Sequence, residues 1–345
     1  MPVNLMRAAH QNAETASGHE IHSLPVLVIL PHSRCNCHCM MCDIWRIRET
    51  REITAGDLEP HLESLRALQV RWVVLSGGEP QLHSDFRALT GMLRLNGFRL
   101  TLLTAGLLLE AHASSVADSV DDVIVSLDGP PEIHDRVRGV RRAFELLAQG
   151  VEALKRRRPG MIVSGRSTVQ KVNFRYLRQT VHTAKRIGLD SISFLAVDLG
   201  TDAFNRPAGW SSVRQSTVAL DSDEVDDLEQ EIKLLTRENS EDIARGYIAE
   251  TPEKLRRIIL HFRAHLGQAR PIAPRCNAPW VSAVIESDGT VRPCFFHHGL
   301  GNVRASSLRD ILNGPTAIEF RQRLDISTNP VCQRCVCSLY IPQAS

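Results

Sequence analysis

Residues 35–42 read Cys35-Asn-Cys-His-Cys39-Met-Met-Cys42 and contain four of the nine cysteines in this 345-residue chain. The other five lie near the opposite end, at positions 276, 294, 332, 335 and 337. Thiolates are soft ligands that favour zinc, copper(I) and iron–sulfur clusters. An odd number of cysteines in two tight groups, with no export signal, argues against a disulfide framework. Metal ligation in a reducing compartment is therefore the better interpretation.

The first cysteine group directly follows an apolar run of strand type at residues 26–30. Strand-like and amphipathic helical segments then alternate, which predicts βαβ units and a parallel sheet. About six such units give an α/β fold, a partial (β/α)6 barrel with its functional loops at the carboxyl ends of the strands. The remaining strands are predicted at residues 71–75, 100–103, 122–126, 161–169 and 191–197.

The periodicity changes beyond the sixth strand. Residues 200–219 are polar and irregular, and two helices follow, one of them starting at Thr251-Pro252 with a cap and a first-turn proline. Further on, Asp288-Gly289 between two short apolar runs predicts a β-hairpin, with short helices after it. We therefore expect an N-terminal extension (1–24), a barrel core (25–198), a linking helical segment (199–270) and a small C-terminal hairpin and helix domain (271–345).

The composition narrows the possible partners. The chain is 43% hydrophobic and 23% charged, and 41 basic against 39 acidic residues leave a formal charge of +2. This balance gives no electrostatic case for binding nucleic acid or an anionic membrane. The first 24 residues lack the apolar core of a signal peptide, and no apolar stretch is long enough to span a bilayer. We expect a cytoplasmic protein.

The spacing of Cys35, Cys39 and Cys42, just after the first strand of a β/α chain, resembles the signature of the radical S-adenosylmethionine (SAM) superfamily. The resemblance implies that these thiolates hold three irons of a [4Fe–4S] cluster and that the fourth iron binds SAM. Reduction by a one-electron donor such as flavodoxin or ferredoxin then cleaves SAM to a 5′-deoxyadenosyl radical, which abstracts hydrogen from a substrate. Structural zinc is the alternative, but no second ligand pair lies within the usual reach of a small zinc module.

The loop departs from the family pattern at two places. Cys37 could replace Cys35 as a ligand, but only Cys35 completes the family spacing, so we interpret Cys37 as a spare thiol beside the cluster. The position before the last cysteine is usually aromatic and is Met41 here, whereas Trp45 follows three residues after Cys42. Packing against the adenine of SAM is therefore expected to differ.

A second motif, Ser76-Gly77-Gly78-Glu79-Pro80, follows the second predicted strand and resembles the GGEP motif of the same family. Two glycines let the backbone approach a ligand closely, and Glu79 offers a counter-charge to an ammonium group. Alone this tetrapeptide is usually a turn. At this distance after a three-cysteine loop, it predicts that Gly77, Gly78, Glu79 and Pro80 meet the amino group of SAM.

Further SAM contacts are implied at later strands. Ser126-Leu-Asp128-Gly129 ends the fourth strand and resembles the serine-containing strand that contacts the ribose and carboxylate of SAM in related enzymes. Arg166, on the fifth, could pair with the SAM carboxylate. The alternatives are a capped turn for Ser126 and Asp128 and a solvated charge for Arg166. Thr104-Ala-Gly106 replaces the Thr-Asn-Gly of relatives, so no role is transferred there.

The second cysteine group resembles the SPASM and Twitch extensions of radical SAM enzymes: a cysteine, a hairpin ending in a second cysteine, a helix, then a CxxC pair. The resemblance implies one auxiliary [4Fe–4S] cluster, with structural zinc again as the alternative. Cys337 is an extra thiol, either a bystander or a substitute for Cys335. The expected ligands are Cys276, Cys294, Cys332 and Cys335.

These features predict a radical SAM oxidoreductase or lyase that acts on a small polar metabolite of sugar or nucleoside type. The alternative is a peptide maturase that modifies a ribosomally made precursor peptide. Only about 24 residues precede the first strand, too few for an independent peptide-recognition domain, which mildly favours a small molecule. A zinc-braced binding protein is a third, non-enzymatic hypothesis. No general base is identified, because His83, His134 and Asp198 are residues of a kind that is more often structural.

Overall fold

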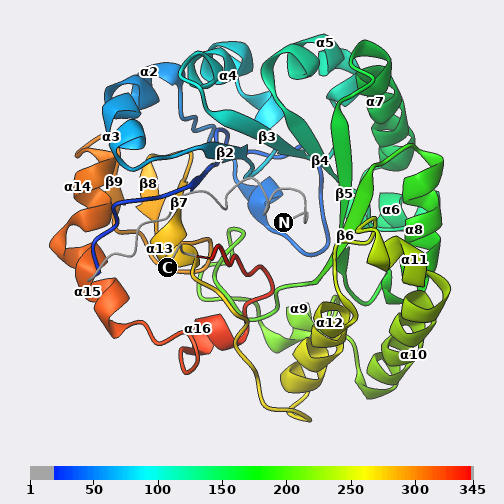
Figure 1. Ribbon diagram of the computed structural model, residues 1–345. Coiled ribbons are helices and arrows are strands. Elements are labelled where there is room, and N and C mark those ends of the chain that lie inside the picture. Colours follow the sequence, from blue (N-terminus) through cyan, green and yellow to red (C-terminus); the bar gives the residue numbers. More distant parts are fainter. Residues whose placement is uncertain (1–18, 343–345) are drawn as a thin grey trace.

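The computed structural model describes residues 19–342, and its centre is one nine-stranded sheet that curves into an open barrel (Figure 1). The strands lie in the order β6-β5-β4-β3-β2-β1-β7-β8-β9. From β1 to β6 every neighbouring pair is parallel, as the alternation of strands and helices predicts. These six strands are β1 (Val26–Ile29), β2 (Trp72–Leu75), β3 (Arg99–Thr104), β4 (Asp122–Ser126), β5 (Ile162–Val169) and β6 (Ser191–Ala196).

Helices cover the outer face of the barrel (Figure 1). Their apolar sides and the outward-facing residues of the strands, such as Leu27 and Leu75, form the main hydrophobic core. Strands buried on both faces explain the nearly continuous apolar runs in the sequence. The covering helices are α2 (Ala55–Leu58), α3 (Leu62–Ala67), α4 (Phe86–Leu95), α5 (Leu109–Ser119), α6 (Pro131–Arg138), α7 (Ala143–Arg157) and α8 (Leu177–Arg186), with short 3-10 helices at Ile44–Arg46, Glu59–His61, Pro80–Leu82 and Phe174–Tyr176.

The segment after β6 contains four helices in the described part of the chain: α9 (Ser212–Gln215), α10 (Ser222–Glu238), α11 (Ser240–Ala244) and α12 (Pro252–His265). The predicted start of α12 is confirmed, because the Thr251 side chain accepts a hydrogen bond from Lys254 N. The Asn173 amide group donates to the carbonyl oxygens of Asp128 and Thr168, each at 3.0 Å, and so joins two adjacent loops.

The C-terminal hairpin is confirmed, with β7 (Ser282–Ile285) antiparallel to β8 (Thr290–Arg292) across Asp288-Gly289. Gly289 has a φ of 87°, which a glycine adopts without strain. β7 also pairs in parallel with β1, so the hairpin extends the barrel sheet. The remaining elements are α13 (Ala278–Val281), β9 (Gly301–Asn302), α14 (Leu308–Asn313), α15 (Pro315–Arg323) and α16 (Pro330–Gln333).

A second, smaller core fills the inside of the barrel near the amino ends of the strands. Val26 and Trp72 from β1 and β2 pack there against Leu339 and Ile341 of the C-terminal segment. The C-terminal segment thus packs against the inner face of the barrel. Within residues 19–342, no helix combines the length and the apolar character needed to cross a membrane.

Candidate functional site

The first cysteine loop lies at the carboxyl end of β1. Cys37 and Cys39 are buried, and Cys35 and Cys42 are half-buried against the loop after β3. The C-terminal end of α6 holds the loop backbone, since the Arg138 carbonyl accepts from the amide of His38 at 2.9 Å. The sequence-predicted ligands are therefore gathered on one loop at the functional end of the barrel.

Arg138 is a residue of this site that sequence reasoning missed. Its buried guanidinium forms an ion pair with Asp128 at 2.5 Å and donates to Cys39 Sγ at 3.6 Å. A hydrogen bond from Cys37, helped by the charge of Arg138, lowers the pKa of Cys39 to about 7. Burial raises the pKa of Cys42 to about 12. No local motif marks Arg138 in the sequence, because its role depends on how α6 packs against the cysteine loop.

Cys37 lies between two of the predicted ligands. Its hydrogen bonds with Cys35 and Cys39 raise its own pKa. We expect Cys37→Ala to keep the cluster and the cleavage of SAM, because the three cysteines with the family spacing remain. Measurement of 5′-deoxyadenosine and of iron per chain checks this, with Cys35→Ala as the matched control that loses both. Loss of SAM cleavage in Cys37→Ala would make Cys37 the ligand.

Gly77 and Gly78 lie after β2 and pack against the segment that leads into the cysteine loop. A Cβ atom at Gly78 would lie 2.1 Å from the Arg34 carbonyl oxygen, and one at Gly77 would lie 2.8 Å from Leu30 Cβ. The amide of Glu79 donates to the same Arg34 oxygen at 2.9 Å. The two glycines are therefore needed for close contact between two loops of this chain, apart from any contact with SAM.

Glu79 is fully buried, and burial raises the pKa of its carboxyl group. Its oxygens accept from Thr104 Oγ1 and Ala105 N, each at 2.9 Å, and from Gln81 N at 3.2 Å. The carboxylate therefore ties the end of β2 to the end of β3. Its predicted contact with the SAM ammonium stays a prediction, as does that of Pro80, which is buried at the start of a 3-10 helix.

Ser126 and Arg166 are register partners on β4 and β5, so their side chains leave the same face of the sheet. Asp128 is fully buried and accepts from Thr168 N at 2.9 Å in addition to its ion pair with Arg138. Asp128 thus braces the loop beside the cysteines, and Arg166 lines a large cavity described below. The predicted contacts of these three residues with SAM stay predictions.

The three histidine and aspartate residues left open in the sequence have partners within the chain. His83 Nε2 is hydrogen-bonded to the Ile53 carbonyl at 2.9 Å, and His134 Nδ1 accepts from Asp128 N at 3.2 Å. Asp198 is buried in an ion pair with Arg206 at 2.9 Å. These contacts give each residue a structural role.

The second cysteine group gathers around one small cavity. Burial raises the pKa of Cys294 to about 12 and that of Cys332 to about 11. His297 Nε2 lies 3.5 Å from Cys332 Sγ, and Cys337 is the exposed member of the group. Half-buried thiols that repel each other as thiolates are a donor set that bound iron would stabilise. The cysteines that line the cavity are Cys276, Cys294, Cys332, Cys335 and Cys337.

Neither cysteine group has the geometry of a single-ion site. A tetrahedral zinc requires four ligands, with sulfur at about 2.3 Å. Across residues 19–342, no three His, Cys, Asp or Glu side chains converge closely enough to hold one metal ion. Cysteine thiolates are the ligands that hold iron–sulfur clusters, so the donor type at each place fits such a cluster.

A cavity of about 830 Å³ lies between β6, α12 and the C-terminal segment. Apolar side chains, among them Phe194, Ile258 and Ile272, form much of its wall, and Cys335 and Cys337 border it. Five cationic side chains line it against one carboxylate, that of Glu250. The cations are Arg166, Lys254, Arg257, Arg275 and Arg334.

Comparison with known proteins identifies the class. Residues 29–184 match the radical SAM superfamily, and residues 276–336 match SPASM, an iron–sulfur cluster-binding domain. The chain belongs to the radical SAM superfamily and has a C-terminal SPASM domain. It is an enzyme of the kind that binds SAM and a [4Fe–4S] cluster in its radical SAM domain and auxiliary iron–sulfur clusters in its SPASM domain.

The chain is similar to two curated relatives in sequence and to one solved structure in fold. It is 25% identical over 302 residues to the Fe-coproporphyrin III synthase of Methanosarcina barkeri, covering 83% of this chain and 73% of the relative. It is 32% identical over 170 residues to the pre-heme d1 synthase of Dinoroseobacter shibae, covering 48% of this chain but only 42% of that relative. Streptococcus suis SuiB bound to precursor peptide SuiA superposes with a TM-score of 0.64 at 18% identity, over 93% of this chain and 72% of SuiB. The likeness to SuiB shows a shared fold.

Proposed function

We propose that this radical SAM enzyme abstracts hydrogen from a small molecule that carries carboxylates on an apolar body, bound in the 830 Å³ cavity. The observation that carries this proposal is the excess of positive charge in a cavity wall that also contains many apolar side chains. Ligand sites of this volume typically combine apolar walls with a few polar groups that set orientation. This proposal keeps a small-molecule substrate but replaces the sugar or nucleoside type expected from the sequence with an anionic, largely apolar molecule.

The cations of the wall have few partners of their own. In the described part of the chain, none of the five has a carboxylate within ion-pair distance, and Arg166 and Arg257 are half-buried. Burial lowers the pKa of Arg257, so its charge lacks full solvation. A carboxylate of the substrate would offset that cost with a charge-assisted hydrogen bond. A neutral sugar or nucleoside would leave Glu250 as the one carboxylate of the wall against five cations.

Names of the relatives support a more specific class. Fe-coproporphyrin III synthase and pre-heme d1 synthase are both named for tetrapyrroles, which carry carboxylate side chains on an apolar macrocycle. We therefore propose that the substrate is a tetrapyrrole that carries carboxylate side chains. Cys335 and Cys337 border the same cavity, so such a substrate would lie beside the auxiliary cluster, which supplies one-electron chemistry when bound. Flavodoxin or ferredoxin remains the proposed electron donor.

A peptide maturase is the second candidate, supported by the fold shared with peptide-bound SuiB. The outer edge of β6, at the end of the sheet, weighs against one way of binding a peptide. Ile192 N donates to the Tyr247 carbonyl at 2.7 Å, and Phe194 N donates to Glu250 at 2.8 Å. Chain segment 247–250 thus covers much of the edge at which an extended peptide would add a strand.

The test is a binding titration of coproporphyrin III to the anaerobic holoenzyme, followed by its absorbance. We expect Arg257→Gln to raise the Kd about ten- to a hundredfold, the equivalent of one charge-assisted hydrogen bond. Arg256→Gln is the matched control, because Arg256 is exposed on the same helix and does not line the cavity. Equal binding of the acid and its methyl ester, or an unchanged Kd in Arg257→Gln, would contradict the proposal.

A further inference from the structure

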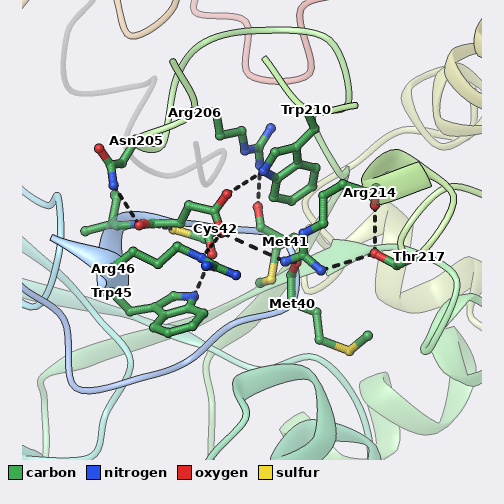
Figure 2. A network of polar contacts seen from close by, with 12 residues as sticks. Met40, Met41, Cys42, Trp45, Arg46, Asn205, Arg206, Trp210, Arg214 and Thr217 are labelled. Carbon is green, nitrogen blue, oxygen red and sulfur yellow. Dashed lines mark hydrogen bonds and ion pairs between the residues drawn. The ribbon is translucent and has the colours of Figure 1, made fainter. Parts of the chain in front are cut away.

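Residues 199–219, the polar and irregular segment after β6, cross over the first cysteine loop, and we call them the strap. Figure 2 shows Arg206, Trp210 and Arg214 of the strap lying against the loop at Met40 and Met41. Asp43, next to Cys42, is held at several points. Its amide donates to the Phe204 carbonyl at 3.1 Å, and its carboxylate accepts from Trp210 Nε1 at 2.5 Å.

Arg206 is the buried centre of the strap. Its Nη1 donates to the Asp198 carboxylate at 2.9 Å, and its Nη2 donates to the carbonyl of Met41, the residue before Cys42. The guanidinium stacks over the Trp210 ring at 3.8 Å, while its buried Nε has no hydrogen-bond partner. A planar guanidinium with several donors can serve a carboxylate and a carbonyl together.

Two buried Arg–Asp pairs therefore flank the cysteine loop with the arginine toward the cysteines. Arg138 lies at Cys39 and is held by Asp128, and Arg206 lies at Cys42 and is held by Asp198. In a buried site such charges are little screened by salt. The paired aspartates hold the arginines in place.

The backbone of the strap is strained around Arg206. Phe204, Asn205 and Ala208 have φ values of 61°, 60° and 61°, in the left-handed region that residues with a Cβ rarely adopt. Strain of this kind persists only where surrounding contacts hold it, and it gathers at functional sites. The contacts with Asp43 and Met41 supply that restraint here.

We propose that Arg206 is a positioning residue for the SAM-binding cluster: it fixes the loop backbone at Met41 and places a positive charge beside Cys42 that favours the reduced state. Reduction adds one electron from the external donor to the cluster. A fixed positive charge nearby stabilises the more negative state, so the midpoint potential of the cluster is higher than it would be without Arg206.

The strap also reaches the second cysteine group. The Phe204 ring lies 5.4 Å from the ring of Phe295 and 6.3 Å from that of Phe296, the two residues after Cys294. A change in the strap can therefore alter the surroundings of both clusters. For this reason the experiment must follow the two clusters separately.

The experiment is a redox titration of the full, anaerobically reconstituted chain, followed by electron paramagnetic resonance. The signal that changes when SAM is added reports the cluster with the open iron. We expect Arg206→Gln to shift the midpoint potential of that signal to a more negative value and to leave the other signal in place. Arg206→Lys, which retains the charge, is expected to remain closer to wild type.

Arg214→Gln is the matched control. Arg214 also donates to a loop carbonyl, that of Met40 at 2.8 Å, but its side chain is 32% exposed, so solvent screens its charge. We expect an unchanged potential in this variant. If Arg206→Gln fails to retain iron, the iron content of Arg206→Gln is compared with that of Arg206→Lys. Retention of iron in Arg206→Lys supports the proposal. An unchanged potential in an iron-replete Arg206→Gln, or equal iron loss in Arg206→Gln and Arg206→Lys, would overturn it.

Discussion

Replacement of Cys35, Cys39 and Cys42 by alanine together is expected to remove the iron of one cluster and to abolish formation of 5′-deoxyadenosine. The three thiolates are gathered at the carboxyl end of β1, and no other cysteine except Cys37 lies in that group. Without them the iron that binds SAM has no anchor. The measurements are iron and sulfide per chain and chromatographic detection of 5′-deoxyadenosine after anaerobic reduction.

The matched control for this experiment is the triple alanine variant of Cys276, Cys294 and Cys332. It should lose a similar amount of iron but keep the cleavage of SAM, because its cysteines line a separate cavity. Continued formation of 5′-deoxyadenosine in the first variant would contradict the assignment of the cluster to residues 35–42. Zinc without sulfide in the wild-type protein would contradict the cluster assignment altogether.

Gly78→Ala is expected to destabilise the protein and to weaken binding of the first cluster. The added Cβ would lie 2.1 Å from the carbonyl oxygen and 2.7 Å from the carbonyl carbon of Arg34, one residue before Cys35. These are backbone atoms, so relief requires movement of the loop itself. Overpacking of this kind costs about 1–3 kcal/mol or more. Thermal unfolding and iron content after reconstitution measure the two effects.

Gly91→Ala serves as the matched control, because nothing lies within 4 Å of a Cβ at Gly91 on α4. In a helix interior, alanine is favoured over glycine by about 0.5–1 kcal/mol, so we expect a small stabilisation. A Gly78→Ala protein with wild-type unfolding temperature and iron content would show that the loop can move aside. The close contact between the two loops would then be unnecessary for stability and for cluster binding.

Much of the barrel could be predicted from apolar runs and helical periodicity. The strand predicted at 122–126 coincides with β4, and the others differ from the structure by a residue or two. The hairpin turn at Asp288-Gly289 was also predictable, because its turn chemistry is local. The pairing of β7 with β1 was not, since Val26 and Ser282 meet only in the folded chain.

The site residues also fall into two groups: those that local sequence patterns predict and those that only the folded chain brings together. Spacing alone drew attention to the cysteines, because ligands of one cluster on a short loop must be close in sequence. Arg138 and Arg206 have no such signature, since they reach Cys39 and Met41 from distant elements. The strap was predicted only as a polar, irregular segment. Its buried arginine became evident only from the ion pair with Asp198 and the contacts drawn in Figure 2.

The sequence by itself determined the order of strands and helices, the two cysteine groups and the kind of chemistry that they support. Each of these follows from patterns a few residues long, which depend on local geometry and ligand chemistry. Only the tertiary structure decided which charges surround the cysteine loop, where the cationic cavity lies and how the C-terminal hairpin completes the sheet. Burial and electrostatic interaction depend on distance in space, and residues such as Arg34 and Gly78 meet only after the chain has folded.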